Sequence, residues 1–328
     1  MDSIAAASGQ TSRPYLTAFS IFIVSCSLAI ILQVFFFSPI TPDPLELPPA
    51  YSASLLPTNS QLQRVIKLGE GLLDRPEDVC VDKNGVLYTA TRDGWIKRFH
   101  RNGSWEDWRR IQSDALLGLK ITKEGSVIVC DAEKGLLKFG EDGVTVLASQ
   151  RFANDVVEAS DGSLYFSVAS TKFGIHDWFF DVLEAKPHGQ LLKFRCLKYW
   201  LSGEGKGKTE IFVDNLPGGP DNIKLAPDGS FWIALLQLTS GGLEYVHTSR
   251  ALKHLVATFP KLLERVKGMH MKATIVNVAP DGRIIRSFDD PDGAVMSFVT
   301  SALEFENHLY LGSLNSNFVG KLSLNGAK

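Results

Sequence analysis

A short phrase of turn, strand, turn and strand recurs along the chain and restricts its fold more than any other feature. The phrase first appears at residues 75–99 (RPEDVCVDKNGVLYTATRDGWIKRF), where Asn84-Gly85 and Asp93-Gly94 separate short β-rich runs. Asn-Gly and Asp-Gly between such runs are strong hairpin signals, because the central residues of these turns need positive φ. The sequence therefore predicts consecutive antiparallel strands joined by tight turns.

The spacing of the repeats indicates which all-β fold they build. The turn glycines Gly85, Gly125 and Gly162 follow one another at intervals of roughly 40 residues. Such a period, with several short strands in each unit, is typical of β-propeller blades. A sandwich or a solenoid is the alternative, but sandwiches rarely repeat one phrase in this way. Residues 301–324 (SALEFENHLYLGSLNSNFVGKLSL) form the last unit, which is expected to close the ring.

Composition sets limits on partners and on redox chemistry. A chain of 328 residues with 45% apolar residues and a net charge of −2 is long enough for a large core, and its Lys and Arg residues are scattered. We therefore expect no nucleic-acid partner. Cys26 lies in an apolar run, so at most one disulfide can join Cys80, Cys130 and Cys196. Cys80 and Cys130 lie in predicted strands of neighbouring repeats, which favours two buried free thiols.

The N-terminal region predicts a membrane anchor. Residues 16–37 are almost wholly apolar and long enough to span a bilayer, and bulky residues at their end favour an uncleaved signal anchor over a cleaved signal. Arg13 precedes this run, and Asp43 and Glu46 follow it, which favours a cytosolic N-terminus. We expect a cytosolic tail at 1–14, a transmembrane signal anchor at 15–38, a Pro- and Ser-rich linker at 39–60 and a β-propeller domain at 61–328. The glycosylation sequon at Asn102 fits a lumenal propeller.

The repeat register brings a set of oxygen-bearing side chains together. Eight residues before three of the turn glycines lie Glu77, Asn154 and Asp221, the last beside Asn222. In a propeller this loop opens on the central channel, so these side chains are expected to converge there. Carboxylate and amide oxygens suit Ca²⁺ better than a transition metal. The alternative is that these Asn and Asp residues only cap turns.

The repeat spacing breaks in the middle of the chain. The interval from Gly162 to Gly229 is much longer than the earlier ones, and an inserted loop at 171–188 precedes two third-strand phrases that abut at residues 194 and 195. About one blade of strands is therefore expected to be missing at this join. We further expect residues 250–271 to form one amphipathic helix that covers a face of the domain.

These phrases resemble those of the strictosidine synthase-like family, and the chain is also similar to adipocyte plasma membrane-associated proteins. The resemblance covers residues 60–328 and the N-terminal anchor, and it is carried by residues 75–99 together with FANDVVEASDGSLYFS, FVDNLPGGPDNI and LYLGSL. It implies an all-β, six-bladed β-propeller, here lacking about one blade, with an N-terminal transmembrane helix. It relates the chain to the Ca²⁺-dependent paraoxonases and gluconolactonases, and therefore implies a hydrolase acting on esters or lactones.

Departures from the family pattern bear on catalysis. Thr300 stands where strictosidine synthase has its catalytic glutamate, so condensation of an amine with an aldehyde in alkaloid biosynthesis is the least favoured function. Leu117 stands where paraoxonases have a histidine base, and the missing segment removes one expected asparagine ligand. Asp131 is the candidate catalytic residue, acting on water at the metal.

Two readings of function therefore stay open. The first is a membrane-anchored hydrolase with a Ca²⁺ cofactor and a small-molecule substrate. The second is a non-catalytic propeller that binds a small molecule or a protein. The expected location is the lumenal side of the secretory system, in the endoplasmic reticulum or the vacuole.

Overall fold

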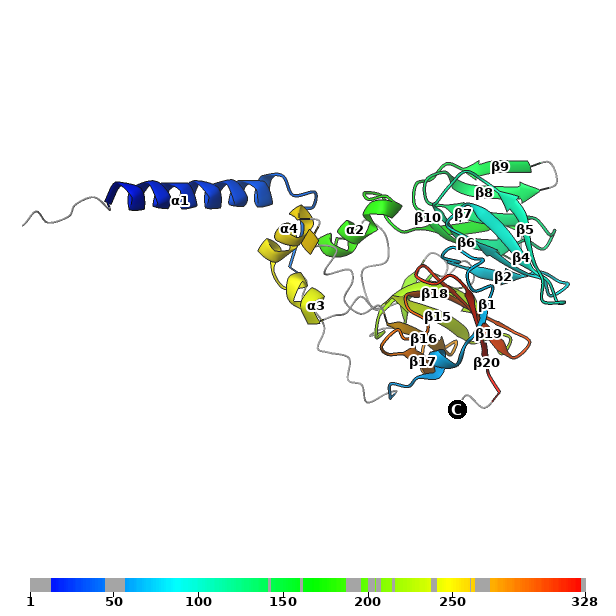
Figure 1. Ribbon diagram of the computed structural model, residues 1–328. Helices are drawn as coiled ribbons and strands as arrows, with labels where there is room; N and C mark the ends of the chain where they lie inside the picture. The colour runs from blue at the N-terminus through cyan, green and yellow to red at the C-terminus, as the bar shows by residue number, and fades with distance from the viewer. Residues whose placement is uncertain are drawn as a thin grey trace, which may run out of the picture.

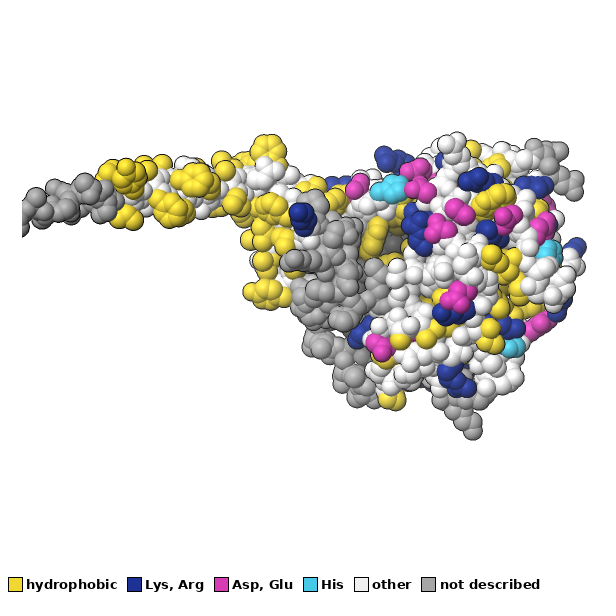
Figure 2. Space-filling view, in the orientation of Figure 1, with side chains coloured by type: hydrophobic (Ala, Val, Ile, Leu, Met, Phe, Trp, Pro, Cys, Tyr) yellow, Lys and Arg dark blue, Asp and Glu magenta, His cyan; other side chains and the backbone are white. Residues whose placement is uncertain are grey.

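The protein is mainly β, with several twisted sheets arranged around a centre and one long helix projecting from them (Figure 1). The computed structural model describes residues 13–44, 57–140, 143–159, 162–186, 196–199, 204, 208–213, 216–236, 241–259, 261–262 and 272–325. On the face seen in Figure 2, acidic and basic side chains are intermixed over the sheets, and apolar side chains cover the projecting helix.

Four antiparallel sheets of four strands each confirm the expected propeller-type fold. In two of them the strands follow chain order and are joined by tight turns, as the repeated phrase predicts. The first sheet contains β2 (Val79–Val81), β3 (Leu87–Ala90), β4 (Trp95–Phe99) and β5 (Trp105–Arg110). The second contains β6 (Leu116–Ile121), β7 (Val127–Asp131), β8 (Gly135–Gly140) and β9 (Gly143–Ala148).

The other two complete sheets contain the C-terminal repeats. One contains β14 (Gly219–Leu225), β15 (Phe231–Leu236), β16 (Ala273–Val278) and β17 (Ile284–Asp290). The last contains β18 (Val299–Phe305), β19 (His308–Ser313) and β20 (Val319–Ser323), and β1 (Ile66–Leu68) pairs with β20 as its fourth strand. The start and the end of the domain therefore share one sheet, and this pairing closes the ring.

Two further sheets have only two described strands each. They are formed by β10 (Ala153–Glu158) with β11 (Leu164–Val168), and by β12 (Cys196–Tyr199) with β13 (Thr209–Val213). Both flank the 194/195 join, which itself lies outside the described residues. The strand count of these two sheets refers to the described residues alone, so the loss of about one blade at the join stays a prediction.

The N-terminal helix α1 (Arg13–Phe36) is long and apolar enough to cross a membrane, with a mean hydropathy of 2.4 over its most apolar stretch. The described residues at both ends of the following linker are packed, although the sequence predicts a simple tether. The Ile40 side chain is buried among helices, and the Thr41 hydroxyl donates to Glu184 Oε1 at 2.8 Å. At the other end of this linker, the Asn59 amide donates to the Ser287 carbonyl at 3.0 Å.

Three short helices form a cap at the foot of α1, between it and the sheets (Figure 1). The expected loop at 171–188 contains η2 (Ile175–Asp177) and α2 (Trp178–Glu184), so its middle is helical. The expected helix at 250–271 is described only as α4 (Arg250–Thr258), and residues 263–271 lie outside the described residues. The sequence prediction missed α3 (Gly241–His247), because its two glycines indicate a turn.

The apolar side of each strand accounts for the packing between sheets. Trp232 of β15 is fully buried in a cluster with Val299 and Leu311 of the last sheet, and it stacks on Phe288 of its own sheet at 5.5 Å between ring centroids. Cys80 and Cys130 are buried and free, as expected, and burial raises the pKa of both thiols. They behave as small apolar side chains at the centre of the fold.

Candidate functional site

A recurrent β-bulge in the innermost strands brings the predicted ligands to the centre of the ring. The register shifts by one residue in β6, β10, β14 and β18, each time near the start of the strand. A bulge interrupts the alternation of side chains, so two consecutive residues can face the same region. The bulged residues are Leu117 and Gly118, Asn154 and Asp155, Asp221 and Asn222, and Thr300.

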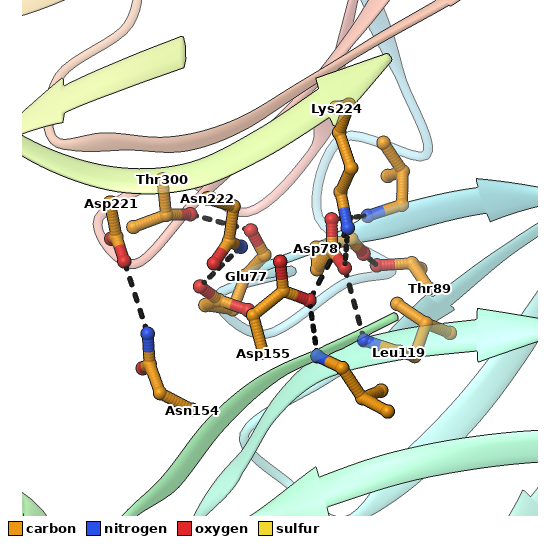
Figure 3. A network of polar contacts seen from close by, with 12 residues as sticks. Glu77, Asp78, Thr89, Leu119, Asn154, Asp155, Asp221, Asn222, Lys224 and Thr300 are labelled. Carbon is orange, nitrogen blue, oxygen red and sulfur yellow. Dashed lines mark hydrogen bonds and ion pairs between the residues drawn. The ribbon is translucent and has the colours of Figure 1, made fainter. Parts of the chain in front are cut away.

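We call Glu77, Asn154, Asp221 and Asn222 the carboxylate–amide group. The structure brings these four predicted residues together (Figure 3), which supports their convergence on the channel. Asn222 Nδ2 donates to Glu77 Oε1 at 3.0 Å, and Asn154 Nδ2 donates to Asp221 Oδ1 at 3.3 Å. The members come from two bulged strands and from the loop before β2, so no local segment could form this group.

Next to it lies a second cluster, which we call the lysine group: Asp78, Asp155 and Lys224 (Figure 3). Lys224 Nζ lies 2.7 Å from Asp78 Oδ2 and 3.4 Å from Asp155 Oδ1. Asp78 also accepts hydrogen bonds from the backbone N–H of Val79 at 2.8 Å and of Leu119 at 3.0 Å. This group ties three blades together through one ammonium.

Burial and mutual repulsion perturb the carboxylates of both groups. Burial, and then the negative charge of Asp221, raises the pKa of Glu77 well above its usual range. Burial also raises the pKa of Asp221 to about 7 and that of Asp155 to about 6, although Asn154 and Lys224 respectively oppose the shift. Burial disfavours the charge of Lys224, but Asp155 and Asp78 outweigh it and raise the pKa of its ammonium. Lys224 therefore stays protonated and cannot form an imine with an aldehyde.

The carboxylate–amide group fits a hard cation. Glu77 and Asn222 are each 1% exposed, and Glu77 Oε2 and Asn222 Oδ1 have no hydrogen-bond partner among the described residues. Buried oxygens without a partner are costly, and a cation would satisfy both of them. Carboxylate and carboxamide oxygens are the ligands that Ca²⁺ prefers, and rotation of the Asn154 carboxamide would turn its oxygen toward Asp221.

The remaining predicted site residues lie elsewhere. Asp131 Oδ1 accepts the N–H groups of Glu133 at 2.8 Å and Lys134 at 2.9 Å, so Asp131 shapes the β7–β8 turn and its role as a base stays a prediction. Asn102 is exposed in the β4–β5 turn, as a glycosylation site requires. Leu117 is buried and offers no proton acceptor.

Thr300, expected from the sequence at the position of the strictosidine synthase base, offers a hydroxyl group and no carboxylate. Its side chain is fully buried, and its hydroxyl donates to the backbone carbonyl of Glu77. The two glutamates that follow it in sequence are engaged away from the channel groups. Glu304 accepts the indole N–H of Trp232 at 2.7 Å, and Glu306 pairs with Arg101 on the surface.

The histidines of the described residues also lie outside the two groups. His100 pairs with Glu106, and His308 contacts the Glu306 carbonyl. His176 of the inserted segment lies 3.4 Å from Glu133 and 3.8 Å from Asp114, all three exposed. The other two described histidines lie in α3 and α4.

Comparison with known proteins identifies the family. The Arabidopsis thaliana "Protein STRICTOSIDINE SYNTHASE-LIKE 4" is 30% identical, over 86% of this chain and 86% of its own length. This chain belongs to the strictosidine synthase-like family. The family model "Strictosidine synthase-like, N-terminal" also matches residues 56–99, which contain the first repeat. A Rattus norvegicus "Adipocyte plasma membrane-associated protein" is 27% identical to this strictosidine synthase-like chain, over 88% of the chain and 93% of the relative.

The comparisons also bear on the fold and on the missing blade. The match to the rat protein extends over 353 positions, more than the whole length of this strictosidine synthase-like chain, so the relative has residues without a counterpart here. A crystal structure provisionally assigned as a gluconolactonase has a TM-score of 0.50 and 14% identity, covering 84% of this chain and 96% of its own. This likeness confirms the propeller-type fold.

The lysine group was not predicted from the sequence, although a signal for it exists. A second polar residue directly follows two of the predicted ligands, namely Asp78 after Glu77 and Asp155 after Asn154. The register count selects one residue per repeat and therefore skips the second. Lys224 is the third residue after Asp221, and a charged side chain in an innermost strand needs a buried partner.

The raised pKa values predict a pH dependence of stability in the calcium-free protein. Between about pH 4 and pH 7 the folded chain retains protons on Asp155 and Asp221 that the unfolded chain releases, so stability is lost as the pH rises. We expect the melting temperature of calcium-depleted protein to fall by several degrees from pH 5.5 to pH 8, and Asp221→Asn to reduce this fall. Calorimetry with and without Ca²⁺ measures the change of the melting temperature with pH. A melting temperature that rises with pH in calcium-depleted buffer would contradict the prediction.

Proposed function

We propose that this strictosidine synthase-like protein is a Ca²⁺-dependent hydrolase of small esters or lactones, anchored by α1 with its propeller in the lumen of the secretory pathway. The observation that supports it most is the pair of buried oxygens that lack partners among the described residues, Glu77 Oε2 and Asn222 Oδ1. Bound Ca²⁺ would supply a fixed positive charge that polarises an ester carbonyl.

The residues of the chain have distinct tasks in this proposal. Glu77 and Asp221 hold the cation by charge, and Asn154 and Asn222 complete its oxygen shell. The Thr300 hydroxyl positions Glu77 by donating to its backbone carbonyl. Lys224 pairs with Asp78 and Asp155 and offsets part of their negative charge, although both carboxylates still raise the pKa of Glu77.

Binding without turnover is the second candidate function, and Leu117 favours it. Hydrolysis needs a group that accepts a proton from water, and Leu117 offers none at the position of the paraoxonase histidine. A propeller with a cation at its centre could then bind an anionic or carbonyl-bearing ligand without cleaving it. Amine–aldehyde condensation is not proposed, because Thr300 cannot act as its base.

One experiment separates these functions. Detergent-solubilised full-length protein is assayed on aryl esters and γ- and δ-lactones with Ca²⁺ and with chelator. Hydrolysis predicts at least about tenfold lower turnover with chelator and in Asn154→Ala, while Asn84→Ala, an exposed turn variant, keeps its activity. Absent turnover with a calcium-dependent rise in melting temperature would support binding. If the protein shows neither turnover nor a calcium-dependent rise in melting temperature, the cation site is rejected.

The proposed orientation has its own test at Asn102. We expect the protein expressed in eukaryotic cells to gain mobility on a gel after glycosidase digestion, because this exposed turn would lie in the lumen. Asn102→Gln should migrate like the digested protein. An undigestible protein that remains in the membrane fraction would point to a cytosolic propeller.

A further inference from the structure

We infer that the Lys224 ammonium occupies the place of a second cation, between Asp78 and Asp155, so that the protein binds one calcium ion and not two. The inference rests on the proposed function only for the first calcium ion, which would bind at the carboxylate–amide group. It assigns Lys224 a positioning role: its ammonium holds Asp78 and Asp155, and through them the chain segments that carry Glu77 and Asn154.

The geometric evidence for this inference comes from pairs of consecutive polar residues at the centre of the ring. Glu77 and Asn154 face the carboxylate–amide group, and the residue after each, Asp78 or Asp155, faces the lysine group (Figure 3). The third pair does not repeat this arrangement. Asp221 and Asn222 both join the first group, and the same strand β14 supplies the lysine group with Lys224 two residues later. Two carboxylates from two blades thus enclose one ammonium where a second divalent ion could otherwise be held.

The two groups differ in how many partners their side-chain oxygens have. Asp78 Oδ1 accepts one backbone N–H, and Asp78 Oδ2 accepts the Leu119 N–H and the Lys224 ammonium. Asp155 Oδ1 accepts the Val156 N–H at 2.8 Å and faces the same ammonium. Glu77 Oε2 and Asn222 Oδ1, which lack partners among the described residues, belong to the other group. The need for a cation is therefore met in the lysine group and unmet in the carboxylate–amide group.

A cavity lies against one member of the lysine group. It has a volume of about 180 Å³, and Lys224 lies in its wall together with Lys120 and Cys80. The remaining lining is largely apolar, from β2, β6 and β18. A shorter or uncharged side chain at 224 would open Asp78 and Asp155 to this cavity, so an ion from solvent could reach them.

The test counts calcium ions. Full-length protein in detergent is titrated with Ca²⁺ by calorimetry and equilibrium dialysis, and the wild type is expected to bind one ion per chain. Lys224→Met should bind two, and Ca²⁺ should raise its melting temperature more than that of the wild type. Lys224→Arg and Lys120→Met should stay at one, because the first keeps the charge and the second removes a lysine that lines the same cavity. Lys224→Met combined with Asp155→Asn should also return to one.

The outcomes separate this inference from the proposed function. A wild type with two ions, or a folded Lys224→Met with one, would overturn the role of Lys224. A wild type with no ion, together with one ion in Lys224→Met, would retain that role and reject the proposed calcium site. If Lys224→Met folds only in the presence of calcium, the ion has replaced the ammonium. If it fails to fold in calcium while the double variant folds, calcium cannot replace it and the inference is wrong.

Discussion

Glu77→Gln is expected to weaken calcium binding by at least about 100-fold, about 2.8 kcal/mol, and to abolish calcium-dependent hydrolysis. The substitution keeps the shape of the side chain and removes one of the two carboxylates of the carboxylate–amide group. It also removes a buried charge whose pKa is raised well above its usual range by burial and by Asp221. The calcium-free variant should therefore be at least as stable as the wild type at pH 8, while its calcium response is lost.

This combination distinguishes a lost ligand from a damaged fold. Calorimetric titration measures the affinity, and thermal unfolding in calcium-free buffer measures the stability. Glu124→Gln is the matched control, because Glu124 is exposed in the β6–β7 turn and should leave both quantities unchanged. Unaltered calcium affinity in Glu77→Gln would remove Glu77 from the cation site.

Gly312→Ala is expected to destabilise the protein by at least about 3 kcal/mol and to reduce calcium affinity as well. A Cβ at position 312 would lie 2.1 Å from the backbone carbonyl oxygen of Glu77 and 2.8 Å from Ser301 Oγ. The first of these contacts is to backbone, so a side-chain rotation cannot relieve it. Strand β19 or the loop that carries Glu77 must move. Because the Ser313 N–H of β19 donates to the Pro76 carbonyl, movement of either one disturbs the position of Glu77.

The control for this variant lies in another blade. Gly140 ends β8, and a Cβ there would meet no atom of the described residues within 4 Å, so Gly140→Ala should change the melting temperature little. Differential scanning calorimetry on both variants measures the difference, which should be several degrees. A Gly312→Ala protein that melts with the wild type would show that the close approach to Glu77 is not a constraint.

The candidate site shows what can be predicted by counting back a fixed number of residues from each turn glycine. The repeat period placed Glu77, Asn154 and Asp221 at equivalent positions, and the structure brings these three side chains and Asn222 together. The count could not show which neighbour contacts which, because the bulges in β10 and β14 turn two consecutive residues inward. The count also selects one residue per repeat, so it missed Asp78, Asp155 and Lys224.

The helical cap shows the limit of local patterns. Residues 171–188 read as a loop, yet α2 forms there, with Phe179 and Leu183 buried against residues of α3 and α4. A helix this short gains little from its own hydrogen bonds, so tertiary packing determines whether it forms. That packing involves Ile40, which lies near the start of the chain, before the first strand of the propeller.

By itself, the sequence determined the repeat, the all-β propeller, the apolar N-terminal helix and the family, because turn residues, strand alternation and hydropathy act over short distances. Only the tertiary structure decided how the polar residues of different blades combine. It showed that one set leaves Glu77 Oε2 and Asn222 Oδ1 without partners among the described residues, and that in the other set Lys224 pairs with both carboxylates. The physical reason is that desolvation and charge pairing depend on distances across the ring, and residues far apart in the chain set those distances.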